Sequence, residues 1–106
     1  MDWIRIEKKF PKGYELVKEW LGDEGIECIR DLYDFFDEQR LHICITKDPQ
    51  ARNYWQTYIW DCTAEEYKDS FYHWIKDGQG FPVFSTRTEA EEQAFEKAFQ
   101  ILEERL

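Results

Sequence analysis

The C-terminal stretch Thr88–Leu106, TEAEEQAFEKAFQILEERL, predicts the element that organises the rest of the fold. Thr88 and Glu91 have the spacing of a capping box, in which both side chains accept backbone N–H groups at the start of a helix. Apolar residues then recur three and four positions apart, at Ala94, Phe95, Ala98, Phe99, Leu102 and Leu106, while Glu92, Glu96, Gln100 and Glu103 are expected to face water. The stretch therefore predicts a long amphipathic helix that covers an apolar surface elsewhere in the chain.

A shorter helix is predicted near the N-terminus. Pro11 lacks the backbone N–H that a helix interior needs, so it suits the first turn of a helix that runs to Trp20 or Leu21. Gly22 is placed to end this helix. A short helical turn over residues 2–9 is expected before it.

The segment from Gly25 to Glu38 predicts another helix, which would form a helical hairpin with the first. Its apolar stripe is Ile26, Ile29, Leu32, Tyr33 and Phe36. Residues 23–38 contain seven acidic residues and one arginine, so they hold six of the nine net negative charges. Four of these acids, Glu27, Asp31, Asp34 and Glu38, follow steps of four, three and four and are expected to form a row on one helix face.

Two strands are predicted after residue 40, because the apolar period changes to two. Leu41, Ile43 and Ile45 alternate with His42, Cys44 and Thr46, as in a half-buried strand. Residues 54–60 are rich in aromatic and β-branched side chains and predict a second strand, antiparallel to the first. If Trp55, Thr57 and Ile59 point toward the helices, then Tyr54, Tyr58 and Trp60 point away, beside His42 and Cys44.

The sequence after Asp61 fits two structures. Thr63 and Glu66 have the spacing of a second capping box, and the apolar residues up to Gly78 keep a helical period, which predicts a helix over residues 63–76. The same residues also fit a hairpin, and we favour the helix. Residues 81–85 are expected to form a strand at the sheet edge, because Pro82 cannot donate a backbone hydrogen bond.

These elements predict one α+β domain over residues 1–106. It consists of two N-terminal helices, an antiparallel sheet of three to four strands, and the capped C-terminal helix packed on the sheet. A chain of 106 residues is long enough to bury a single core.

The composition restricts the classes of function. The net charge of -9 disfavours direct binding to nucleic acid. Three cysteines without paired spacing indicate reduced thiols, and the opening MDWIRIEKK has no signal or membrane-spanning pattern, so we expect a soluble cytoplasmic protein with no membrane partner. Phe, Tyr and Trp make up 18% of the chain, which favours exposed rings at a binding surface.

Two stretches together resemble small uncharacterised proteins encoded by phages and prophages. They are residues 31–39, DLYDFFDEQ, and residues 85–92, STRTEAEE, which run into Ala94-Phe95 and Ala98-Phe99. The resemblance covers under half of the chain and carries no catalytic residue or assigned activity. It implies a mobile element inside a bacterial cell, where small acidic proteins often bind host or phage proteins.

The sequence contains no recognisable catalytic or metal-binding motif. His42, Cys44, Cys62 and His73 are possible metal ligands, but their spacing matches no zinc pattern, so no metal or other cofactor is expected. A Cys–His pair also suggests a nucleophile and its base, but no third orienting residue accompanies it in the sequence. The glycine-rich and phosphate-loop motifs of nucleotide-binding enzymes are absent. We therefore expect a protein that is not an enzyme.

Two hypotheses for function remain. The first is a non-catalytic protein-binding module, acting on a partner or by self-association, with Tyr54, Tyr58 and Trp60 as its binding residues. The alternative is an acidic mimic of nucleic acid, in which the carboxylate row of Glu27, Asp31, Asp34 and Glu38 occupies the basic groove of a DNA-binding protein.

Overall fold

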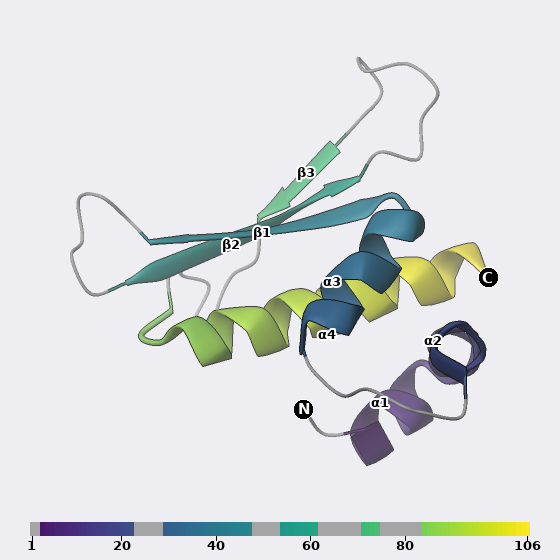
Figure 1. The fold of residues 1–106 in the computed structure, drawn as a ribbon. Helices are drawn as coiled ribbons and strands as arrows, with labels where there is room; N and C mark the ends of the chain where they lie inside the picture. The colour runs from purple at the N-terminus through teal and green to yellow at the C-terminus, as the bar shows by residue number, and fades with distance from the viewer. Residues whose placement is uncertain (1–2, 23–28, 48–53, 62–70, 75–83) are drawn as a thin grey trace.

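The protein is an α+β domain in which the described helices lie on one side of an antiparallel sheet (Figure 1). The computed structural model describes residues 3–22, 29–47, 54–61, 71–74 and 84–106. In chain order the elements are α1 (Trp3–Lys9), α2 (Pro11–Leu21), α3 (Ile29–Glu38), β1 (Leu41–Lys47), β2 (Trp55–Asp61), β3 (Phe71–Trp74) and α4 (Arg87–Arg105). The predicted class, with an antiparallel sheet and a C-terminal helix packed on it, is confirmed.

The N-terminal helices follow the sequence signals closely. Pro11 lies in the first turn of α2, and Gly22 ends the helix with φ +70° while its N–H donates to the carbonyl of Lys18. The positive φ explains the glycine, because a Cβ disfavours that backbone region. Of the helix predicted from Gly25, α3 is described from Ile29, and residues 23–28 lie outside the described part of the chain.

The sheet has the strand order β1-β2-β3, with antiparallel pairing throughout. His42 lies opposite Trp60 and Cys44 opposite Tyr58. Leu41, Ile43, Thr57 and Ile59 are buried on the helix side, as the alternation predicts. The buried Thr57 hydroxyl donates to the Cys44 carbonyl at 2.9 Å, so this polar group is satisfied within the sheet.

The helix predicted over residues 63–76 is wrong where the structure describes it, because Phe71–Trp74 forms β3. The four residues FYHW pair with the edge of β2 that faces away from β1. Without this pairing, the backbone N–H and C=O groups along that edge would lack partners in the sheet. The rest of that predicted helix lies outside the described residues. So do residues 81–83 of the last predicted strand, of which Phe84 forms an isolated bridge to Trp55, with both N–H···O distances at 2.8 Å.

Helix α4 contributes the largest part of the core. The rings of Phe35, Phe36, Phe95 and Phe99 are fully buried together, at the meeting point of α3 and α4. Phe36 and Phe99 meet edge to face, with their centroids 5.0 Å apart. The predicted stripe is thus confirmed except at Leu106, which is 50% exposed.

The predicted capping box of α4 is wrong by two residues. The N-cap is Thr86, whose Oγ1 accepts the N–H of Glu89 at 3.1 Å, and the helix begins at Arg87. Thr86 and Glu89 have the same spacing as Thr88 and Glu91, so the sequence offers two equivalent starts. Glu91 makes other contacts: its Oε1 accepts hydrogen bonds from Tyr33 Oη and from Arg87 Nε, both at 3.1 Å.

Two glutamates of α4 that were expected to face water are instead covered by the N-terminal helices. Glu96 Oε1 lies 2.9 Å from both Arg5 Nη2 and Lys9 Nζ. The Glu103 carboxylate accepts the backbone N–H groups of Lys12 and Gly13, at 3.2 and 2.7 Å. The prediction failed here because α2 packs against α4 in addition to the sheet, and Arg5 and Lys9 of α1 also reach α4.

Candidate binding site at the end of the sheet

The connection between α3 and β1 brings polar side chains together at one end of the sheet. Gln39 N donates to the Phe35 carbonyl at 3.2 Å, and Arg40 N donates to the Asp37 carbonyl at 3.0 Å. Arg40 has φ +61°, the left-handed conformation that commonly ends a helix. This tight turn sets the last turn of α3 beside the second residue of β1.

Asp37 and His42 form a hydrogen-bonded pair across this turn. Asp37 Oδ1 lies 2.8 Å from His42 Nδ1, and both side chains are about half exposed. An ionised carboxylate only accepts hydrogen bonds, so the hydrogen lies on Nδ1 of His42. In the neutral ring, Nε2 then carries the lone pair and is available to an incoming group.

A pocket of about 370 Å³ is lined by Asp37, Arg40, His42 and Trp60. His42 and Trp60 are directly opposite in the sheet, so they share its outer face, away from the helices. Arg40 is exposed and forms no ion pair with the described part of the chain. The pocket therefore combines an aromatic wall, an available guanidinium and an imidazole that Asp37 holds in place.

The three aromatic residues selected from the sequence lie on the outer side of the sheet but do not form one cluster. Trp60 lines the pocket and Tyr58 lies two residues further along β2, opposite Cys44; both are half-buried. Tyr54 is 46% exposed and precedes β2. Trp60 is six positions after Tyr54, which is about 20 Å along a strand.

Sequence reasoning missed Asp37 and Arg40 as parts of a site. In the sequence Asp37 is one of seven acids over residues 23–38, and no motif marks Arg40. The available signal was the length of the connection, because only Gln39 and Arg40 separate the end of α3 from the start of β1. A connection this short keeps the last turn of a helix next to the first residues of the following strand.

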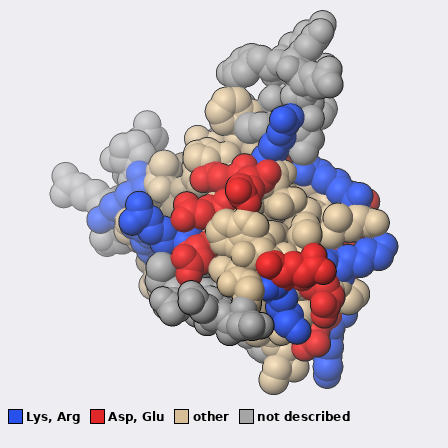
Figure 2. Space-filling view, turned by 45° about the vertical axis from the view of Figure 1, so that its right-hand side comes forward, with Lys and Arg blue, Asp and Glu red and all other residues tan. Residues whose placement is uncertain are grey.

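The predicted acidic row is only partly an exposed surface. Asp34 is exposed, Asp31 is half-buried, and Glu38 accepts a hydrogen bond from Trp20 Nε1. Glu27 lies outside the described residues. On the face seen in Figure 2, acidic side chains are interleaved with lysine and arginine rather than forming a continuous acidic stripe.

Three of the four possible metal ligands, His42, Cys44 and His73, lie in the described strands. His42 lies opposite Trp60 in the sheet, whereas His73 lies opposite Ile59, one position out of that row. Cys62 lies outside the described residues, and Cys44 is a free, half-buried thiol. The described segments contain no group of three or more His, Cys, Asp or Glu residues that could hold a metal ion.

Comparisons with family models, curated proteins and solved structures found no match to this chain. They therefore neither support nor contradict the resemblance to phage-encoded proteins. Within the described segments, no helix has the length and apolar character needed to cross a lipid bilayer.

Proposed function

We propose that this chain is a non-catalytic protein-binding module and that the pocket at the end of the sheet is its binding site. The observation that carries the proposal is the meeting of Trp60 and Arg40 at one pocket, beside the Asp37–His42 pair. Tryptophan and arginine are the residue types most enriched at the energetic centres of protein interfaces. A cytoplasmic location belongs to the same proposal, because the odd number of cysteines favours a reducing compartment.

The proposed occupant is a segment of another protein that places a carboxylate on Arg40 and an apolar group against Trp60. The planar guanidinium suits a carboxylate because it can donate two parallel hydrogen bonds. Asp37 pairs with His42 and forms no ion pair with Arg40, so the guanidinium keeps its donors for an incoming carboxylate. The net charge of -9 would slow the approach of an acidic partner, but salt screens charges beyond about 8 Å under physiological conditions.

The Asp37–His42 pair also resembles an orienting residue and its base in an enzyme. Nucleophilic catalysis would require a hydroxyl or thiol within hydrogen-bonding reach of the imidazole. Asp37 is the partner of His42 within the described part of the chain, and no Ser, Thr or Cys side chain there bonds to the ring. The proposal of binding therefore rests on the pocket of Trp60 and Arg40 and not on this pair.

Affinity capture with matched variants tests the proposal. The wild type, Arg40→Asn and the exposed control Lys8→Asn are used as baits in a lysate of cells that express the chain naturally. Asn removes the charge at position 40 but tolerates its positive φ, so the fold should be kept. We expect a partner that the wild type and the control retain and that Arg40→Asn loses.

The captured partner is then purified and its affinity is measured by calorimetry. Loss of the Arg40 contacts should weaken binding about tenfold or more, because charge-assisted hydrogen bonds are the strong ones. Equal affinity of the wild type and Arg40→Asn for every retained protein would refute the pocket as the binding site.

The acidic mimic of nucleic acid is the second candidate, and it is favoured by the exposure of Asp34, Asp37 and Glu38 along one end of α3. A mimic should compete with DNA for basic proteins, and the competition should weaken steeply with salt. Asp34→Lys reverses an exposed charge of the row and should relieve that competition while leaving the fold intact. If the chain competes with DNA equally well after this substitution and at raised salt concentration, the result would argue against a mimic.

A further inference from the structure

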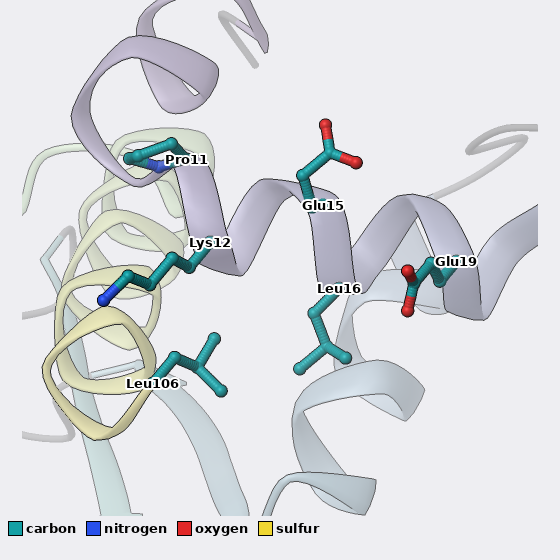
Figure 3. Close-up of a pocket in the computed structure, with 6 residues that line it drawn as sticks. All are labelled: Pro11, Lys12, Glu15, Leu16, Glu19 and Leu106. Atoms are coloured by element: carbon teal, nitrogen blue, oxygen red, sulfur yellow. The ribbon is translucent and has the colours of Figure 1, made fainter.

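A second surface, on the other side of the molecule from the sheet, lies between α2 and the C-terminal end of α4 (Figure 3). It is an open groove of about 510 Å³ whose lining residues are Pro11, Lys12, Glu15, Leu16, Glu19 and Leu106. Figure 3 shows the side chains of Leu16 and Leu106 pointing into the same space. Leu106 is half exposed and Leu16 is half-buried, so the floor of the groove is apolar and accessible.

The charges of the groove are arranged along the axis of α2. Lys12 and Glu19 lie on either side of Leu16, while Glu15 points away from Leu106 (Figure 3). Glu19 is seven positions after Lys12, which is about 10 Å along the helix. Both side chains are exposed, and neither forms an ion pair within the described segments.

This arrangement is complementary to itself. If a second α2 lies antiparallel to the first across a two-fold axis near Leu16, Lys12 of each copy meets Glu19 of the other. Leu16 and Leu106 of one copy then face the same two leucines of the other copy at the centre of the interface. A two-fold interface uses the same patch on both subunits, and this patch satisfies that requirement without any other partner.

We propose that the groove is a dimer interface and that its occupant is a second copy of this chain, packed through antiparallel α2 helices. The inference is independent of the pocket at the end of the sheet, because the two surfaces share no residue. An interface built on one helix of 11 residues is smaller than those of permanent dimers, so the dimer should form reversibly.

Charge exchange between two variants gives a sharp test. Lys12→Glu creates two Glu–Glu contacts in its own dimer, and Glu19→Lys creates two Lys–Lys contacts. An equimolar mixture of the two variants restores two opposite-charge contacts, and so does the chain that carries both substitutions. Lys8→Glu on α1 and Glu92→Lys on α4 are matched controls, since both change exposed residues outside the groove.

Light scattering and sedimentation over about 1 μM to about 1 mM protein cover the affinities expected of a small interface. We expect the wild type and both controls to dimerise with rising concentration. Each single reversal should weaken the dimer about tenfold or more, because like charges then meet at two places. The mixture and the double variant should recover it, and circular dichroism checks that every variant is folded.

Two results would overturn the inference. One is a wild type that remains monomeric at the highest concentration. The other is a dimer whose dissociation constant is the same in the wild type and both single reversals, which would place the interface elsewhere.

Discussion

At the residue scale, Glu103 provides the N-terminal cap that α2 lacks in its own sequence. The N-cap position is occupied by Phe10, which makes no side-chain capping bond. Glu103, from α4, instead accepts the N–H groups of Lys12 and Gly13. A carboxylate at this position satisfies two backbone donors and also stabilises the positive end of the helix dipole.

Glu103→Gln should therefore lower the free energy of unfolding by about 1 kcal/mol, since the amide has one acceptor and no charge. Urea denaturation measures the change. Glu104→Gln is the control, because Glu104 is exposed and takes no part in the cap. Equal destabilisation by the two changes would show that the cap contributes nothing.

Gly13 of α2 is buried against α4. A Cβ at this position would lie 3.3 Å from Phe99 Cδ1, and Phe99 is fully buried, so its ring has little room to move. An alanine usually stabilises a helix relative to glycine by about 0.5–1 kcal/mol.

We expect Gly13→Ala to destabilise the protein instead, by about 1–3 kcal/mol, because overpacking outweighs the helical preference. Thermal melts of Gly13→Ala in the wild type and in a Phe99→Leu background test this. The smaller side chain in that background should reduce or reverse the loss. A rise in melting temperature in the wild-type background would contradict the steric argument.

At the element scale, α3 and α4 are joined by a hydrogen bond from Tyr33 to Glu91. Burial and the adjacent Glu91 charge raise the pKa of Tyr33 to about 12. Because this pKa exceeds the ordinary value near 10, folding is favoured while the phenol is neutral. That stabilisation is complete below pH 10 and is lost as the pH rises from 10 to about 12.

Tyr33→Phe should lose the hydrogen bond at every pH. It should also reduce the loss of stability that the wild type shows between pH 10 and about 12. Urea midpoints of the wild type and the variant, compared below pH 10 and near pH 12, give the difference that belongs to Tyr33. Lysine deprotonation affects both proteins equally and cancels in that comparison. Parallel profiles for the two proteins would mean that Tyr33 does not titrate in this way.

The secondary structure was predictable where the local sequence pattern allowed one type of element, and the folded protein contains that element. Pro11 and Gly22 bound α2 as expected, and the alternation predicted the buried residues Leu41, Ile43, Thr57 and Ile59 of β1 and β2. Phe71–Trp74 was misassigned because a short aromatic run fits either period, and pairing with β2 decides between them. The pocket at the end of the sheet was missed because it depends on the turn at Arg40, whereas Trp60 was found from its strand alone.

At the scale of the whole molecule, Phe99 is where the layers meet. Its ring contacts Trp3 of α1, Phe36 of α3 and Phe10 beside α2, with centroids 6.1, 5.0 and 6.2 Å away. Phe99→Ala should cost about 3–5 kcal/mol, a large part of the stability of a small domain. Leu106→Ala, at the half-exposed residue that follows α4, should cost less than about 0.5 kcal/mol.

Thermal melts of these two variants test the assignment of the core. A large loss for Phe99→Ala beside a small one for Leu106→Ala is the expected pattern. Similar losses for both would mean that the end of α4 is as deeply packed as its middle.

The packing of α1 and α2 against α4 has a consequence for the order of folding. Arg5 and Glu96 are 91 residues apart in the sequence, yet their side chains touch. During synthesis on the ribosome, the first two helices therefore emerge long before the surface that they cover. Contacts between such distant segments slow folding, because a long loop must close before they form. We expect the β1–β2 hairpin to form early and the N-terminal helices to dock last, which pulsed hydrogen exchange during refolding would reveal as late protection of the Lys12 and Gly13 amides.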